Sequence, residues 1–154
     1  MGDETSLPAG TVLRRWVRLR RRLTAPPERV VRAWSDPDEL ARWFPERIEG
    51  GLAVGFRSTL VWPDRRIWWD VVEAAERRFV FRRSWLANDR LVTTVQVLIE
   101  PAGSGSLLGL EDGPFPLEEP GALDAWAEAI ETWSEALAML RAYLDFSVDL
   151  RLQG

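Results

Sequence analysis

The stretch from Leu123 to Phe146, LDAWAEAIETWSEALAMLRAYLDF, decides the fold that we expect. Its apolar residues recur at alternating spacings of four and three, which places them on one face of a helix with glutamates on the other side. This apolar stripe consists of Trp126, Ile130, Trp133, Leu137, Leu140 and Leu144. At 1.5 Å per residue the helix is about 36 Å long, enough to cross a whole sheet. Two tryptophans on one stripe indicate that the helix covers a concave surface, filled either by side chains or by a ligand.

The composition limits the chemistry that this chain can perform. A chain of 154 residues fits one domain that buries roughly 70% of its unfolded surface. We expect a flexible tail over residues 1–11 and a single domain over residues 12–150. The chain has no cysteine and no histidine, which excludes disulfides, thiolate catalysis, histidine triads and most transition-metal sites. We therefore expect no cofactor, no metal and no catalytic residue, and a cytoplasmic location. No apolar run approaches the roughly 18 residues of a membrane span, so membrane insertion is not expected.

The segment before the first turn has the pattern of a half-buried strand, followed by two short helices. Apolar and charged residues alternate from Arg14 to Leu23, except that Arg21 falls on the apolar side. The prolines that follow favour a helix over Pro27–Trp34. Asp36 then provides an N-cap, with proline directly after it, for a second helix that we expect to end at about Phe44.

The middle of the chain contains one strand candidate after another, separated by short turn-like segments. The candidates are Val54–Val61, Ile67–Ala74, Arg78–Trp85, Leu91–Glu100, Ser106–Glu111 and a shorter piece around Arg47–Leu52. Short connections between successive strands predict an antiparallel meander. A proline-rich loop over residues 112–121 is expected to lead into the long helix.

Basic residues cluster on the solvent side of the first strand, where Arg18, Arg20 and Arg22 form a row with Trp16. Contact with phosphates is the functional interpretation of such a row. The net charge of −4 and the lack of a recognition motif favour instead cross-strand pairing with acids or the protection of an edge strand by charge. No nucleic-acid partner is expected.

Four segments in this order resemble a known superfamily. They are TAPPERV at residues 24–30, AWSDPDELARW at residues 33–43, RRFVF at residues 77–81 and EPAGSGSLL at residues 100–108. Together with Trp133 and the leucines after it, they resemble the START-like or SRPBCC superfamily, in the branch of the activator of the heat-shock chaperone ATPase. The resemblance implies an α+β helix-grip fold, with a curved antiparallel sheet of six to seven strands around a long C-terminal helix and two short helices after the first strand. It also implies a bacterial type of protein.

A cavity between the sheet and the last helix is what the resemblance implies for function, because superfamily members bind lipids, polyketides, hormones or aromatic compounds there. The residues that we expect to line it are Arg21, Trp43, Phe56, Trp62, Trp69, Phe81, Arg83, Trp85, Val97, Leu110, Trp126, Trp133, Leu137 and Tyr143. Aromatic side chains line apolar pockets as readily as they fill cores, so a filled interior is the structural alternative.

Three polar residues in this set are candidates for orienting a ligand. Arg21 and Arg83 are predicted to face inward, where an unpaired guanidinium would cost several kcal/mol, so each requires a partner such as Glu73 or Asp112. Either arginine would bind an anionic or carbonyl group of a ligand. The structural alternative, which we favour, is an internal ion pair or an arginine at the rim of the sheet. The hydroxyl of Tyr143 would donate to a ligand carbonyl, or lie at the rim of the core.

The function that we expect is binding of a small hydrophobic or aromatic molecule, of lipid-like or polyketide-like type, by a monomer or homodimer. One alternative is a cyclase or hydrolase on the same fold, which would need a carboxyl group with a pKa shifted by burial. The other is a protein interaction module similar to the chaperone activator, which would need a large exposed apolar patch.

Overall fold

The fold is described over residues 13–153 of the chain, in a computed structural model. The tail expected over residues 1–11 lies outside the described residues. The elements are β1 (Arg14–Leu23), α1 (Pro27–Ser35), α2 (Pro37–Leu40), β2 (Arg47–Glu49), β3 (Arg57–Val61), β4 (Arg66–Ala74), β5 (Arg78–Trp85), β6 (Asn88–Ala102), β7 (Gly105–Pro116), α3 (Ala122–Phe146) and the 3₁₀ turn η2 (Leu150–Gln153).

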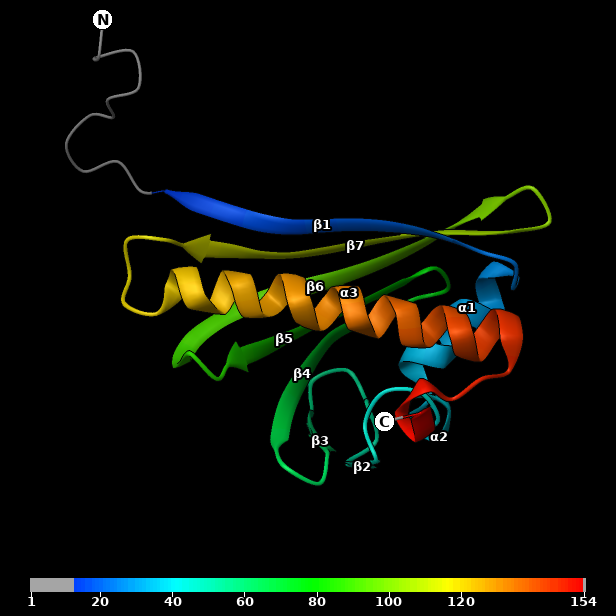
Figure 1. Ribbon diagram of the computed structural model, residues 1–154, viewed down its shortest axis with the longest axis horizontal. Helices are drawn as coiled ribbons and strands as arrows, with labels where there is room; N and C mark the ends of the chain where they lie inside the picture. Colours follow the sequence, from blue (N-terminus) through cyan, green and yellow to red (C-terminus); the bar gives the residue numbers. More distant parts are fainter. Residues whose placement is uncertain (1–12, 154) are drawn as a thin grey trace, which may run out of the picture.

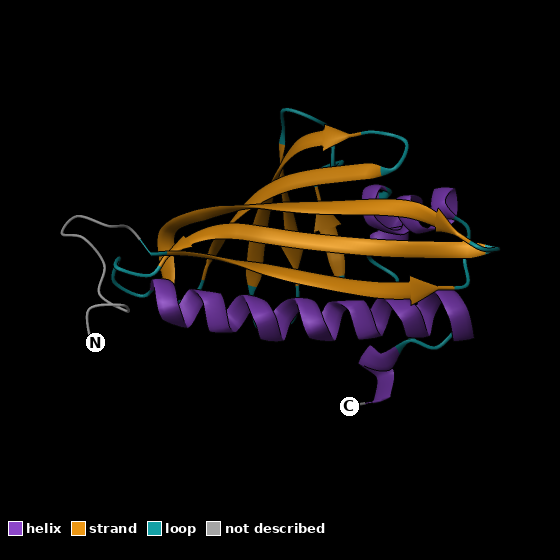
Figure 2. Ribbon diagram, turned by 90° about the horizontal axis from the view of Figure 1, so that it is seen from above, coloured by secondary structure: helices purple, strands orange, loops and turns teal. Residues whose placement is uncertain are grey.

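The seven strands form one antiparallel sheet in the order β1-β7-β6-β5-β4-β3-β2. The sheet curves, and α3 runs along its concave side (Figures 1 and 2). The two short helices lie near the C-terminal end of α3 and close that end of the interior (Figure 1). This arrangement confirms the expected α+β helix-grip fold. Among residues 13–153, none of the helices combines the length and the apolarity needed to cross a bilayer.

The second short helix is shorter than the sequence predicts. The N-cap is as expected, since the Asp36 carboxylate accepts hydrogen bonds from the backbone N–H groups of Asp38 and Glu39 at 2.9 and 3.4 Å. The helix ends at Leu40 rather than at about Phe44, and turns lead the chain into Pro45. Proline disfavours helical geometry at the residue before it, so the helix cannot continue into Phe44 and Pro45.

The strand β7 is longer than predicted, and it includes part of the expected proline-rich loop. It runs to Pro116 because β1 pairs with it along its whole length, from Leu23 opposite Ser106 to Arg14 opposite Pro116. The register of β1 shifts between Arg15 and Val17, and the pairing of β7 with β6 ends at Gly113. Pro114 therefore lies where the ladder is already irregular, which is where a strand tolerates proline. The loop proper covers only residues 117–121.

The buried face of α3 is rotated from the predicted stripe towards alanine. The buried residues are Ala122, Ala125, Ala129, Trp133, Ala136, Leu137 and Leu140. Ile130 is 38% exposed, and Trp126 is only half-buried, with its Nε1 donating to the backbone oxygen of Trp16 at 3.3 Å. Alanine has the smallest side chain of the apolar set, so the helix comes closest to the sheet along the alanines. The larger side chains Trp126 and Ile130 then lie at the edge of the contact.

Candidate functional site

The space between the sheet and α3 is filled by aromatic side chains. Trp69 of β4 stacks on Phe81 of β5 with ring centroids 3.7 Å apart. Trp34 of α1 lies 5.1 Å from Trp43 and 6.3 Å from Trp133 of α3. These five rings are almost completely buried. The interior is therefore a packed aromatic core. At its centre, side chains fill the space that a ligand cavity would need.

The residues predicted to line a ligand site fall into three groups. The buried residues are Trp43, Trp69, Phe81, Arg83, Trp85, Val97, Leu110, Trp133 and Leu137. The half-buried residues are Arg21, Trp62, Trp126 and Tyr143. Phe56 alone is far from the interior, with 69% of its surface exposed. The structure thus brings most of the set together, around one core.

Phe56 does not share an inward face with Trp62, contrary to the parity expected from a strand beginning at Val54. The strand β3 begins only at Arg57. Phe56 belongs to the turn before it, where its backbone N–H donates to the Ala53 oxygen at 3.1 Å. Alternation between faces holds only within a strand, so the count from Val54 assigned Phe56 to the wrong face.

Arg21 lies at the rim rather than in the interior. It borders an open groove between β1 and α3, together with Arg141 and Phe146, and its Nη1 donates to the backbone oxygen of Arg20 at 2.7 Å. Neither expected partner reaches it, since Glu73 forms an ion pair with Arg78 at 3.2 Å. Arg21 therefore does not face the interior, and its place at an open groove corresponds to the rim position given as the structural alternative.

Arg83 is the buried cation of the fold, as predicted, with 1% of its surface exposed. Its guanidinium stacks over the ring of Trp85 at 3.6 Å, and its Nε donates to the Ser84 oxygen at 2.9 Å. Glu128 of α3 forms its ion pair, with Nη2 and Oε2 3.8 Å apart. Burial lowers the pKa of Arg83 to about 10, although the negative charges of Asp112 and Glu128 act in the opposite direction.

Asp112 is the buried carboxyl group beside Arg83, on the inner face of β7. Its Oδ2 accepts a hydrogen bond of 2.8 Å from Nε1 of Trp133, which connects the strand to α3. Burial raises the pKa of Asp112 to about 6, while hydrogen bonds from Thr93 and Trp133 and the charge of Arg83 act to lower it. Within residues 13–153, Oδ1 of Asp112 and Nη1 of Arg83 are buried without a hydrogen-bond partner.

A small hollow opens on the surface along one side of α3. Its volume is about 170 Å³. Its apolar wall is made by Phe44, Trp62, Ile67 and Leu86, and α3 contributes Glu128, Glu131, Thr132 and Glu135. Glu128 belongs to both features, because it lines the hollow and forms the ion pair with Arg83. A molecule seated in the hollow would therefore lie against the rings of Phe44 and Trp62 and next to Glu128.

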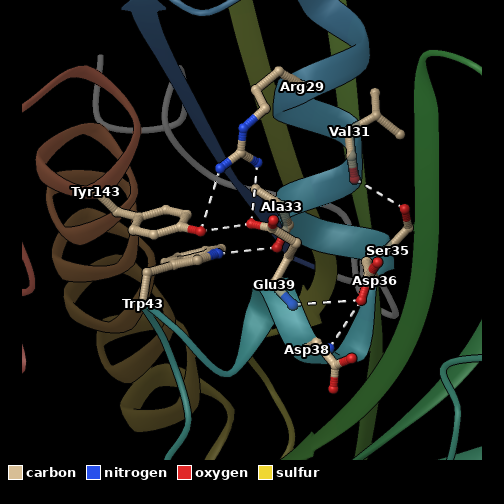
Figure 3. Close-up of polar contacts among 9 residues, drawn as sticks. All are labelled: Arg29, Val31, Ala33, Ser35, Asp36, Asp38, Glu39, Trp43 and Tyr143. Atoms are coloured by element: carbon tan, nitrogen blue, oxygen red, sulfur yellow. Dashed lines mark hydrogen bonds and ion pairs between the residues drawn. The ribbon is translucent and has the colours of Figure 1, made fainter. Parts of the chain in front are cut away.

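Tyr143 belongs to a separate polar network that joins α3 to the two short helices (Figure 3). Its hydroxyl donates to Oε2 of Glu39 at 2.6 Å and accepts from Nη2 of Arg29 at 3.3 Å, while Nη1 of Arg29 lies 3.1 Å from the same carboxylate oxygen. Burial acts to raise the pKa of Glu39, but the hydrogen bond from Tyr143 and the charge of Arg29 together lower it. The network accounts for the half-buried position of this tyrosine.

A model of the activator of Hsp90 ATPase homolog 1-like family matches residues 24–145 of the chain. The chain belongs to this family. The resemblance to the START-like superfamily, in the branch of the activator of the heat-shock chaperone ATPase, is thereby confirmed. No curated protein matches the chain.

Several solved structures have the same fold as this chain. The protein MLL2253 from Mesorhizobium loti superposes with a TM-score of 0.74 at 22% identity, over 84% of this chain and 96% of that one. DynU16, from the dynemicin biosynthetic locus, gives 0.73 at 21% identity, over 86% of this chain and 48% of that one. The Aha1 dimer from Colwellia psychrerythraea superposes with a TM-score of 0.74 at 16% identity, over 86% of this chain and 97% of that one. At these identities the likeness concerns the fold.

Within this family fold, sequence reasoning missed the partner of Arg83. Glu128 was assigned to the outer, glutamate-rich side of the last helix, but it lies next to the buried Ala129 at the edge of the contact face. The signal that would have found it is the run of alanines, since a helix packed along small residues brings its flanking side chains close to the sheet. Thr93, whose Oγ1 accepts a hydrogen bond of 2.9 Å from Nε1 of Trp85, carried no comparable signal.

Proposed function

We propose that this protein binds a small aromatic molecule in the hollow between α3 and the strands β3–β5. The observation that carries the proposal is the wall of the hollow, in which Phe44 and Trp62 meet edge to face at 5.1 Å and Ile67 and Leu86 complete an apolar surface. The resemblance to a superfamily with ligand-binding members, and a structural neighbour from a biosynthetic locus, support it. Affinity would come mainly from apolar surface removed from water, at about 25 cal/mol per Å².

The size of the hollow restricts the ligand to about one aromatic ring. Pockets for drug-sized ligands measure about 300–1,000 Å³, whereas an apolar cavity of about 150 Å³ holds a benzene. The volume of about 170 Å³ is close to the second figure. A long-chain lipid would require the aromatic core to open, so the proposal narrows the expected range of ligands to small ring compounds. A cytoplasmic location and a monomeric or homodimeric state remain part of the same proposal.

The test compares two variants of α3, one that should abolish ligand binding and one that should leave it unchanged. Thr132→Phe would fill the hollow, which Thr132 lines, while Ala127→Phe adds the same side chain at an exposed position of the same helix. Thermal melting is followed with benzene derivatives, fused ring compounds and a long-chain fatty acid. We expect single-ring compounds to raise the melting midpoint of the parent and of Ala127→Phe but not of Thr132→Phe. If no compound raises the midpoint of the parent, or if Thr132→Phe responds like the parent, the proposal is wrong.

An interaction module is the second candidate, and one surface favours it. Val54, Phe56 and Val72 are each about half exposed or more, and the backbone N–H of Val71 binds the Phe56 oxygen, so the turn before β3 lies beside β4. Exposed apolar patches of this kind mark partner sites when they are contiguous. The family name suggests the partner to test, a purified chaperone of the Hsp90 type. Stimulation of its ATPase by the parent and not by Phe56→Glu would support this candidate, and no stimulation would remove it.

An enzyme on the same fold remains the third candidate, since Asp112 is a buried carboxyl group with a raised pKa. Any compound that binds in the melting experiment is incubated with the protein and examined by mass spectrometry. Unchanged recovery of the compound supports binding without turnover.

A further inference from the structure

The strand β1 lies at an edge of the sheet and carries a high positive charge. In the strand order it pairs only with β7, and it forms the upper margin of the sheet in Figure 1. Its ten residues include six arginines and no acidic residue. An edge strand presents backbone N–H and C=O groups that a further strand can bind. The charge of β1 and its free backbone groups together define which strand would fit.

The hydrogen-bonding pattern of the sheet shows which backbone groups of β1 are free. The N–H of Ile99 in β6 donates to the oxygen of Arg77, on the side of β5, at 2.8 Å. Successive residues of a strand bond to opposite sides, so Leu98 bonds towards β7 and its partner Gly109 bonds back towards β6. Arg20 is the partner of Gly109 in β1. Its backbone groups, like those of the residues two positions before and after it, therefore point away from β7.

The free part of this edge is the middle of the strand, because α3 contacts the backbone near both ends. At one end, Nε1 of Trp126 donates to the Trp16 oxygen at 3.3 Å. At the other, Oδ1 of Asp145 accepts from the Thr24 N–H at 3.1 Å. Between these contacts lie residues 18–22, which extend over about 16 Å at about 3.3 Å per residue. A segment of about five residues would therefore have room to pair with β1.

One face of an added strand would lie beside a row of exposed arginines, Arg18, Arg20 and Arg22, on the outer face of the sheet. Arg18 forms an ion pair with Glu111 at 3.0 Å, whereas Arg20 and Arg22 form none with any of residues 13–153. Opposite charges on neighbouring strands stabilise their pairing, and like charges oppose it. The row therefore favours an acidic strand and disfavours the β1 of a second copy, in which arginine would face arginine.

The other face of an added strand would lie over the open groove between β1 and α3. The groove has a volume of about 420 Å³ and is lined by Leu137, Ala138, Ala142 and Phe146, with Arg21 and Arg141 beside them. Side chains of a strand alternate between its two faces, so every second side chain of the partner would meet this mainly apolar surface. Nη1 of Arg21 donates to the Arg20 oxygen at 2.7 Å, where it takes the place of a partner's N–H and would turn aside on binding.

We propose that β1 binds an extended peptide in which acidic and apolar residues alternate, by adding it to the edge of the sheet. The backbone of the peptide pairs with residues 18–22, its carboxylates lie beside the arginine row, and its apolar side chains enter the groove beside α3. In this mode of recognition the backbone hydrogen bonds provide affinity and the alternate side chains provide specificity. The surface shares no residue with the hollow, so the inference is independent of the aromatic ligand.

The experiment measures the binding of three fluorescent peptides of about ten residues to the full chain by fluorescence anisotropy at low salt. The first alternates glutamate and valine. The second has the same composition, with all glutamates in one block and all valines in the other, and the third is the alternating peptide with methylated backbone nitrogens. We expect the first to bind at least about tenfold more tightly than the other two, because several backbone bonds or side-chain contacts are lost together.

Two variants with the same change of charge test the location. Arg20→Glu reverses the charge in the middle of the edge, whereas Arg77→Glu does so just before β5, three strands away, and both arginines are exposed. We expect Arg20→Glu to weaken binding of the alternating peptide at least about fivefold, since an attraction between neighbouring strands becomes a repulsion. Arg77→Glu should change it less than about twofold. The comparison of the three peptides on the parent stands even if Arg20→Glu does not fold.

The other possible results would overturn the proposal. Equal binding of the alternating and block peptides would mean that the arginines attract any polyanion, and equal binding of the methylated peptide would exclude backbone pairing. If a single-stranded oligonucleotide or a vesicle of anionic lipid displaces the alternating peptide and binds more tightly, the arginine row belongs to that partner instead. A dimer of the parent in sedimentation that is blocked by the peptide would assign the edge to a second copy. If no peptide binds, the proposal is wrong and the aromatic hollow is unaffected.

Discussion

The buried carboxyl group of Asp112 makes a quantitative prediction about stability and pH. Burial raises the pKa of Asp112 from its ordinary value of 3.8 to about 6 in the folded protein. Between these two values the folded protein binds more protons than the unfolded chain, so the free energy of unfolding falls as the pH rises through this window. A shift of about two units corresponds to about 3 kcal/mol once the pH is above 6. Asparagine at this position carries no charge and incurs no such cost.

We therefore expect the stability of Asp112→Asn, relative to the parent, to increase by about 2–3 kcal/mol between pH 4 and pH 7. The attraction between Asp112 and Arg83 is already contained in the shifted pKa of Asp112, and Arg83, whose pKa is about 10, stays charged throughout this range. Contributions from all other groups are common to both proteins and cancel.

The measurement is urea denaturation of both proteins at half-unit steps of pH, followed by tryptophan fluorescence. Asp70→Asn is the control with the opposite sign, because hydrogen bonds of 2.7 and 2.9 Å from Arg57 lower the pKa of Asp70. The stability that Asp70 contributes is present above its unfolded pKa and is lost as the pH falls through its folded pKa. The free energy of unfolding of Asp70→Asn, relative to the parent, should therefore decrease as the pH rises. A difference for Asp112→Asn that is flat with pH, or that falls, would refute the reasoning.

Three further predictions concern packing and polar contacts elsewhere in the fold. Tyr143→Phe removes the hydroxyl that binds Glu39 at 2.6 Å and should lower the free energy of unfolding by about 1–2 kcal/mol in urea; a loss of affinity for aromatic probes would in addition support the ligand role predicted for Tyr143. On β7, Gly105→Ala would drive its Cβ into a backbone oxygen of β1, whereas Gly109→Ala meets nothing closer than 4.0 Å, so only the first should lower the melting midpoint. Ala129→Leu would separate α3 from the sheet at a fully buried position and should cost about 1–3 kcal/mol in the same urea assay, unless the helix shifts without strain.

The order of the elements could be predicted from the sequence because local patterns encode it. The alternation in β1, the N-cap at Asp36 and the turn residues between the strands each reflect interactions between residues close in the chain. Errors occurred where distant elements decided the outcome. The pairing with β1 extended β7 to Pro116, and the true start of β3 placed Phe56 outside the interior.

The candidate site divides in the same way. Arg83 was predicted from the sequence to face inward, because strand parity is a local property, and Asp112 was named as a possible partner. That Glu128 forms the ion pair, and that Trp133 binds Asp112, depends on how α3 is rotated against the sheet. No pattern within the helix specifies this rotation, since alanines and larger apolar residues form two overlapping stripes on it.

The sequence by itself determined the fold, the family and the presence of a charged residue on the inner face of an aromatic core. Periodicity, capping and turn chemistry act over a few residues, so they can be read along the chain. Only the tertiary structure decided that the rings fill the interior, that a small hollow remains beside α3, and that, among residues 13–153, Nη1 of Arg83 and Oδ1 of Asp112 lie buried without partners. These features arise where side chains from β5, β7 and α3 meet. Their geometry depends on volumes and registers that no single segment contains.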